Sequence, residues 1–153
     1  MSEPDSRPVY CLFCDDIRTE LGGKLSFMGL YGAELILNIP FPAILPKLGV
    51  IIGMIHKIGD QPKFIKVKIY GPVTGEEVAQ FDINDIPPQP IEEGMTKGHL
   101  RLTFQLVPFA IPQAGSVEVF VETERDSVRA GRLKISTKAE PASSDALGDN
   151  SLR

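Results

Sequence analysis

Two cysteines near the start of the chain have the spacing of a redox pair or of half a zinc site. Cys11 and Cys14 lie in a β-branched and aromatic run, residues 9–17. Side chains three residues apart on a strand face opposite sides, so the two sulfurs could neither form a disulfide nor share a metal ion. A zinc site would also need two more ligands, and His56 and His99 are the chain's only histidines. We interpret both cysteines as small apolar side chains in a reducing compartment, and we predict no metal site.

Two adjacent carboxylates follow in the same run. Asp15 and Asp16 could form an acid dyad or a cation site, but neighbouring side chains on a strand face opposite sides. One of them is therefore expected to point toward the core, where it would need a partner such as Arg18, Arg101 or backbone N–H groups. We expect the polar cluster of Asp15, Asp16 and Arg18 to be structural. The alternative is a hydrolase or a small-ligand or metal binder that uses the Asp15/Asp16 region.

Motifs of the common catalytic chemistries are missing from the sequence. It contains no Gly-x-Ser-x-Gly, no phosphate-binding glycine loop and no His-Glu-x-x-His. His56 lies near the end of a predicted strand and His99 on the solvent side of another, and neither has a readable acid partner that would orient it as a general base. We predict no catalytic residue and no cofactor, and we favour a non-catalytic protein over an enzyme.

Composition and charge restrict the classes of partner. The 153 residues are 42% hydrophobic and 24% charged, which is typical of one globular domain. The net charge of −4, without a basic block, argues against nucleic-acid binding. The longest apolar segment, residues 48–55, is much shorter than the ~20 residues of a membrane helix, and residues 1–8 show no secretion signal. We therefore expect a soluble, cytoplasmic protein without membrane contact.

Short β-patterned runs separated by Gly, Pro, Asp and Asn fill most of the chain, and no window has the apolar stripe of a helix. The run at residues 48–58 is apolar on both faces, so it is expected to be a central strand or to have its outer face covered by a loop. Prolines in residues 39–46 and 86–94 predict crossovers rather than strands. The predicted strands cover residues 8–19, 24–38, 48–58, 63–70, 77–83, 98–107, 116–124 and 128–136.

These strands predict an all-β fold, an antiparallel β-sandwich of immunoglobulin-like or fibronectin-like topology with an extra N-terminal hairpin. The domain would span residues 8–137, and a disordered tail would occupy residues 138–153. Gly22-Gly23 predicts a two-residue hairpin turn, which would set Asp16 opposite Gly29 and Arg18 opposite Phe27. In the last strand the apolar residues change from one face to the other, which predicts a bulge at Ala130-Gly131.

The opening of the predicted domain resembles a known family. Residues 13–31 contain Asp15-Asp16, a turn with Gly23-Lys24, and Gly29 followed closely by Tyr31. This combination is similar to the opening of a family of small bacterial proteins of unknown function. The resemblance implies a bacterial or phage source, and it assigns no activity to any residue.

One possible binding surface follows from the predicted topology. Immunoglobulin-like topology places the strands at 63–70 and 116–124 side by side, so their outward residues would share one face. Opposite charges across such a pair stabilise the alignment by ~0.2 to 1 kcal/mol each. The outward residues are Phe64, Lys66, Lys68, Tyr70, Glu118, Phe120 and Glu122.

Single apolar residues scattered over a protein surface are common, but three aromatic side chains on one solvent-facing surface are unusual. We interpret this surface as a contact for a protein partner or for self-association, and we expect a binding or structural module that acts through protein contacts. The alternative is that residues 39–46 fold over the surface. A carbohydrate site is disfavoured because the chain has no Trp and only three Tyr.

Overall fold

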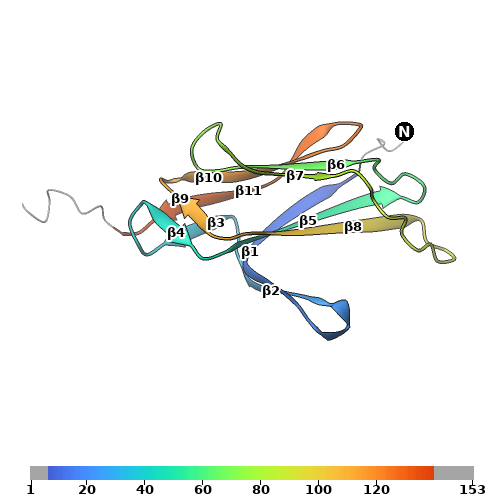
Figure 1. The fold of residues 1–153 in the computed structure, drawn as a ribbon, viewed down its shortest axis with the longest axis horizontal. Coiled ribbons are helices and arrows are strands. Elements are labelled where there is room, and N and C mark those ends of the chain that lie inside the picture. Colours follow the sequence, from blue (N-terminus) through green and yellow to red (C-terminus); the bar gives the residue numbers. More distant parts are fainter. Residues whose placement is uncertain (1–6, 140–153) are drawn as a thin grey trace, which may run out of the picture.

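The computed structural model describes residues 7–139, and within them the chain forms strands and a single short 3-10 turn (Figure 1). The all-β prediction is confirmed. In this part of the chain no helix is long and apolar enough to cross a bilayer. The strands are β1 (Val9–Thr19), β2 (Leu25–Leu30), β3 (Glu34–Leu37), β4 (Ala43–Leu45), β5 (Leu48–Lys57), β6 (Ile65–Tyr70), β7 (Glu77–Ile83), β8 (Lys97–Leu106), β9 (Phe109–Ile111), β10 (Gly115–Glu122) and β11 (Ser127–Thr137).

The strands form two sheets that lie face to face, and a small ribbon at one end (Figure 1). The first sheet has the order β2-β1-β5-β8, and the second has the order β3-β11-β10-β6-β7. Strands β4 and β9 pair as the ribbon. The predicted antiparallel pairing holds except between β3 and β11, which run parallel, because the chain crosses to the second sheet after β2 and there runs alongside the last strand.

Alternation of apolar and polar residues buries one side of each central strand between the sheets, as predicted. The inward side chains of β6 and β10 are almost completely buried, and those of β1 and β5 pack against them from the first sheet. Burial of one such side chain contributes roughly 1.5 to 3 kcal/mol. The contacts involve Ile65, Val67, Ile69, Val117, Val119 and Val121 on one side and Phe13, Val50, Ile52 and Met54 on the other.

Strand β5 is central in its sheet, as predicted from its two apolar faces. On its outer face Ile51 is fully buried in a second, smaller cluster with Cys14, Ile17 and Phe27. The β1–β2 hairpin supplies three of these four side chains. Ile51 on the outer side of β5 is therefore covered by the hairpin rather than left in water.

Cys11 and Cys14 are free thiols on opposite sides of β1, as predicted. Cys11 packs against the main core, where burial raises its pKa to about 12. Cys14 is buried in the smaller cluster, and burial raises its pKa as well. Both sulfurs are thus held as unreactive thiols at neutral pH.

The register between β1 and β2 differs from the prediction. Asp16 lies opposite Met28 and Arg18 opposite Ser26, so the predicted alignment is wrong by one residue. The turn contains three residues, Leu21–Gly23, and the Glu20 N–H donates to the Lys24 carbonyl oxygen at 2.6 Å. Both glycines of the turn have positive φ, which a three-residue loop uses as readily as a two-residue loop does.

Other local predictions have mixed outcomes. The bulge is confirmed, because Val119 pairs with Gly131 and Phe120 with Arg129, which leaves Ala130 as the extra residue. The predicted strand at 24–38 is wrong as a single element, since residues 31–33 separate β2 from β3. Residues 86–94 form no strand, as predicted, but the crossover predicted at 39–46 contains β4.

The predicted tail lies mostly outside the described residues. Lys138 still extends the parallel pairing, because its backbone N–H donates to the Leu37 carbonyl oxygen at 2.9 Å. Residues 140–153, on which the prediction of disorder falls, are outside the described residues.

Candidate functional site

Strands β6 and β10 pair antiparallel, which confirms the pairing predicted for residues 63–70 and 116–124. The register sets Tyr70 opposite Glu118, Lys68 opposite Phe120, and Lys66 opposite Glu122. Since the alternate residues of both strands are buried, these six half-buried side chains share the outer face. We call this surface the β6–β10 face: Lys66, Lys68, Tyr70, Glu118, Phe120 and Glu122. Phe64, also predicted here, is half-buried but lies one residue before β6 begins.

Two aromatic rings form the apolar centre of the β6–β10 face. The centroids of Tyr70 and Phe120 are 5.6 Å apart and their planes make an angle of 88°. This edge-to-face geometry is favoured by the ring quadrupoles. The two rings therefore support one another and present a rigid apolar surface to the outside.

The charges around this pair differ in one detail from the prediction. Lys66 lies directly opposite Glu122, as expected. The ion pair recorded for Glu118, however, is with Arg129 of β11, whose Nη1 is 3.7 Å from Oε2. Arg132, opposite Glu118 on β11, donates from Nε to Ser116 Oγ at 3.0 Å. Strand β11, the neighbour of β10, thus contributes cations that the sequence did not assign to the site.

A pocket of about 570 Å³ opens on the β6–β10 face. Tyr70, Phe120, Lys68 and Glu118 line it, and the turn between β6 and β7, residues 71–75, forms one wall. Its volume falls in the range of sites that receive small molecules or single side chains. No residue of 39–46 lines it, because Ala43–Leu45 pairs with β9 instead. The suggested covering of this surface by residues 39–46 is therefore wrong.

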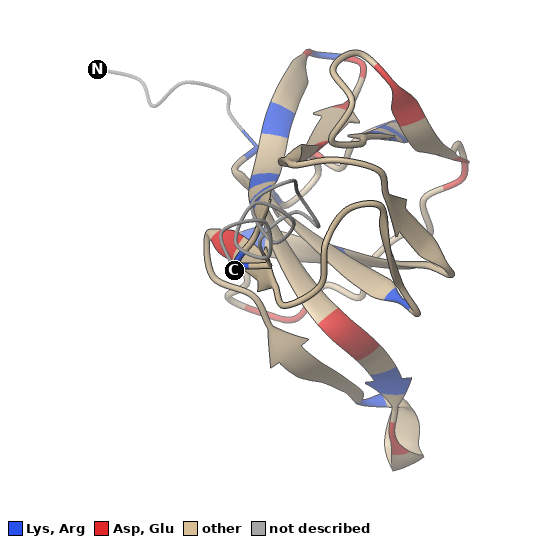
Figure 2. Cartoon of the chain, turned by 90° about the vertical axis from the view of Figure 1, so that its left-hand side faces the viewer, with Lys and Arg blue, Asp and Glu red and all other residues tan. Residues whose placement is uncertain are grey.

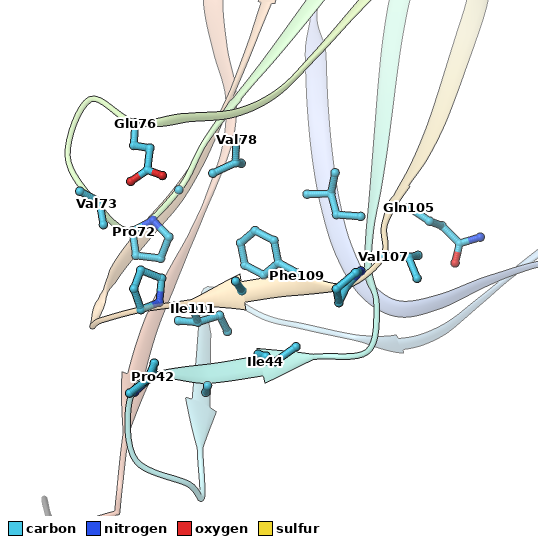
Figure 3. A pocket seen from close by; sticks show the side chains of 16 residues that line it. Pro42, Ile44, Pro72, Val73, Glu76, Val78, Gln105, Val107, Phe109 and Ile111 are labelled. Carbon is cyan, nitrogen blue, oxygen red and sulfur yellow. The ribbon is translucent and has the colours of Figure 1, made fainter.

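A second pocket, of about 550 Å³, lies where the β4–β9 ribbon meets the turn after β6 (Figure 3). Its lining is mostly apolar, with Glu76 and Gln105 as the polar side chains among the labelled residues. Sequence reasoning missed this pocket because it depends on β4 and β9, whose short runs stand between prolines. The apolar lining includes Pro42, Ile44, Pro72, Val73, Val78, Val107, Phe109 and Ile111.

The Asp15/Asp16 region does not form a convergent acid site. Asp15 accepts a hydrogen bond from the Tyr31 hydroxyl. Asp16 accepts from Arg18 Nε at 3.0 Å and from Lys47 Nζ at 3.3 Å, and these two bonds lower its pKa, with Arg18 the larger cause. The two carboxylates therefore have different partners. In residues 7–139 no group of three or more metal-ligating side chains is present.

The expectation that one of these carboxylates points into the core is wrong. Asp15 is exposed and Asp16 is half-buried. The reason is that β1 pairs with β5 only as far as Cys14, so the hairpin beyond that residue has left the space between the sheets. A Cβ on Gly29 would lie 2.2 Å from Asp15 Oδ2, so this glycine makes room for Asp15 and not for Asp16 as expected.

The two histidines have structural partners rather than acid partners. Buried His56 has its Nδ1 2.8 Å from the Lys57 carbonyl oxygen and its Nε2 3.3 Å from Gln89 Oε1. Gln89 Nε2 in turn donates to the His99 carbonyl oxygen at 2.6 Å. Exposed His99 has its Nε2 2.9 Å from Tyr10 Oη. Gln89 thus fastens the proline-rich segment 84–96 to β5 and β8.

Replacing Gln89 with Ala is expected to lower the free energy of unfolding by about 1 to 2 kcal/mol, because it leaves Nε2 of buried His56 without this partner. Amide hydrogen exchange in residues 84–96 should become faster, since their side-chain link to β8 is lost. Urea unfolding and exchange mass spectrometry measure the two effects. Gln80→Ala is the control, because the side chain of Gln80 bonds to exposed Asp82, at 3.4 Å. Equal effects of the two substitutions would contradict the role of Gln89 in linking residues 84–96 to β5 and β8.

A charged network at the opposite end from the β4–β9 ribbon was not foreseen. The Arg7 side chain is 6% exposed; its Nη2 lies 2.7 Å from Glu124 Oε1 and its Nε donates to the Asp60 carbonyl oxygen at 3.0 Å. Arg125 binds the Asp60 carboxylate as well. The bond from Arg7 holds the pKa of Glu124 at about 2, and the bond from Arg125 is the largest cause of the lowered pKa of Asp60.

No protein-family model matches the chain, and no curated protein matches it. On the β6–β10 face a pocket and predicted site residues coincide. A functional argument therefore starts from the geometry of this face.

Proposed function

We propose that the chain is a non-catalytic binding module that acts through protein contacts at the β6–β10 face. The observation that carries this proposal is the Tyr70–Phe120 pair, which lines a pocket of about 570 Å³ with Lys68, Glu118 and Arg132 around it. Residues that dominate the energy of protein interfaces are enriched in Tyr, Trp and Arg and cluster in pockets surrounded by polar groups. This arrangement is the one expected of a small contact site.

The partner is inferred from the chemistry of the pocket. An aromatic or branched apolar side chain would bury itself against Tyr70 and Phe120. Lys68 and Arg132 would donate hydrogen bonds to carbonyl or carboxylate oxygens at its edges, and Glu118 would accept one from a backbone or side-chain N–H. A segment of a partner protein supplies all of these groups at once.

We further infer an immunoglobulin-like topology, with the site on the outer face of its G-F-C sheet. The order of the second sheet supports this inference, because β6, β7, β10 and β11 take the places of strands C, C′, F and G. Strands β1, β5 and β8 take those of A, B and E in the other sheet. Residues 15–30 then constitute an additional hairpin. The free thiols Cys11 and Cys14 favour a reducing, cytoplasmic setting for the protein.

The alternative, a hydrolase or a small-ligand or metal binder at Asp15 and Asp16, has less support. Such chemistry requires carboxylate oxygens that converge on one substrate or ion. Asp15 is engaged by Tyr31, and Asp16 by Arg18 and Lys47. We therefore place the function on the β6–β10 face.

Selection of displayed peptides on the immobilised full chain tests the proposal. Enriched peptides should carry an aromatic or branched apolar residue, and Phe120→Lys should weaken their binding by about 30-fold or more, as loss of a central contact worth 2 kcal/mol does. Ile44→Lys is the matched control, because Ile44 is an exposed apolar residue that lines the other pocket. No enrichment, or equal loss of binding in both variants, would contradict the proposal.

A further inference from the structure

The β1–β2 hairpin projects from the body of the molecule (Figure 1, Figure 2). Strand β1 pairs with β5 only through residues 9–14, so residues 15–30 extend beyond the point where β5 begins. We call residues 15–30 the hairpin arm. Among the described residues no strand pairs with the outer edge of β2, which leaves a row of backbone N–H and C=O groups available there.

The hairpin arm exposes an unusual number of large apolar side chains. Four of them are exposed by 38 to 97%. The charged side chains Asp16 and Arg18 lie on β1, away from the free edge. The exposed apolar residues are Leu21, Leu25, Met28 and Leu30.

Strand β2 also lacks the protection that the other sheet edges have. Proteins discourage accidental pairing of an edge strand by placing charged residues on it or by keeping it short. Edge strand β8 carries Lys97 and Arg101, β7 carries Glu77 and Asp82, and β3 has four residues including Glu34. The sequence of β2, LSFMGL, contains neither a charge nor a proline. Gly29 has a φ of 68°, which interrupts the extended backbone, so residues 25–28 are the part of this edge available for pairing with another strand.

Side chains of opposite charge, Lys24 and Asp15 of β1, lie near the two ends of β2, which suits pairing with an identical strand. Lys24 stands directly before β2, and the Asp15 carboxylate lies against Gly29 near its end. When two copies of a strand pair antiparallel about a two-fold axis, the start of each lies beside the end of the other. Lys24 of each copy is thereby brought toward Asp15 of the other, which favours this orientation over a parallel one.

We propose that β2 pairs antiparallel with β2 of a second copy of this chain. The first sheets of the two copies then join into one continuous sheet, and the apolar side chains of the two hairpin arms cover one another. The contact is small, since it consists of one strand pair and a few side chains. The dimer therefore dissociates on dilution. This surface is separate from the β6–β10 face, which stays accessible in the dimer.

Sedimentation of the full chain between about 1 μM and about 1 mM tests the proposal, because a small interface dissociates within this range. The wild type should change from monomer to dimer with concentration. Met28→Lys should raise the dissociation constant by at least about tenfold, since it places like charges at the new strand pair. Ile91→Lys, at an exposed apolar residue outside the hairpin arm, should leave it unchanged.

A charge substitution and hydrogen exchange locate the contact. Lys24→Glu should weaken the dimer, whereas Lys97→Glu, the same charge change at the opposite edge of the sheet, should not. Amides of β2 should exchange more slowly in concentrated than in dilute wild type, and circular dichroism confirms that each variant is folded. A wild type that stays monomeric to about 1 mM overturns the proposal. The proposal is also wrong if Phe120→Lys dissociates the dimer and Met28→Lys does not.

Discussion

Replacing Arg7 with Ala is expected to lower the free energy of unfolding by about 2 to 3 kcal/mol, because its buried side chain makes charge-assisted hydrogen bonds to Glu124 and Asp60, whose carboxylates are partly exposed. Arg7 binds Glu124, in the turn between β10 and β11, and Asp60, in the turn after β5. Its removal leaves the Glu124 carboxylate without a cation in a partly desolvated position. The same change detaches the start of the described chain from both turns.

Urea unfolding at neutral pH, followed by far-UV circular dichroism because the chain has no Trp, measures this effect. Arg18→Ala is the matched control: its pair with Asp16 is exposed, and such pairs contribute at most about 1 kcal/mol. If both substitutions cost the same free energy, the network at Arg7 does not have the stabilising role that its burial indicates.

Acid should weaken the same network. Because the pKa of Glu124 is held at about 2, below its ordinary value of 4.5, the carboxylate stabilises the folded state fully above pH 4.5. That contribution is lost as the pH falls from about 4.5 to about 2. Partial contact of the carboxylate with water reduces the expected loss to about 1 to 2 kcal/mol. Glu124→Gln should therefore flatten the stability profile in this range.

Replacing Gly115 with Ala is expected to cost about 2 to 3 kcal/mol, because the new methyl group would collide with main-chain atoms. A Cβ at this position would lie 2.5 Å from the Pro72 carbonyl oxygen and 3.0 Å from Pro72 Cα. These atoms belong to the turn that walls the pocket on the β6–β10 face. The turn would have to move outward, so the pocket would widen as the protein lost stability.

Gly32→Ala is the matched control, because a Cβ there meets no atom within 4 Å and its backbone needs no positive φ. Urea unfolding of the two variants should separate them clearly, with Gly32→Ala within about 0.5 kcal/mol of the wild type. A Gly115→Ala protein as stable as Gly32→Ala would mean that the approach of β10 to the turn at Pro72 is looser than described.

Local patterns in the sequence determined much of the fold. The alternation in β6 and β10 predicted which side chains are buried, because a strand has a period of two regardless of its neighbours. Two apolar faces predicted the central place of β5. The change of the apolar residues from one face of β11 to the other predicted the bulge at Ala130, because one extra residue in a strand moves the following side chains to the opposite face.

The candidate site was predicted in part. Topology and alternation placed Lys66, Lys68, Tyr70, Glu118, Phe120 and Glu122 on one surface, and the pairing of β6 with β10 confirms that placement. The sequence did not indicate that the turn after β6 forms a wall, or that Arg129 rather than a lysine binds Glu118. Both depend on how a third strand and a loop approach the pair.

Only the tertiary structure decided the contacts that join segments far apart in the chain. Gly22-Gly23 is compatible with loops of two or three residues, and in the observed register Ile17 and Phe27 lie opposite one another and join one apolar cluster with Ile51. The β4–β9 pairing, the bonds of Gln89 and the network at Arg7 likewise connect residues that no local pattern relates. A strand's own sequence specifies which side chains share a face, but its alignment with a partner depends on the packing of the whole core.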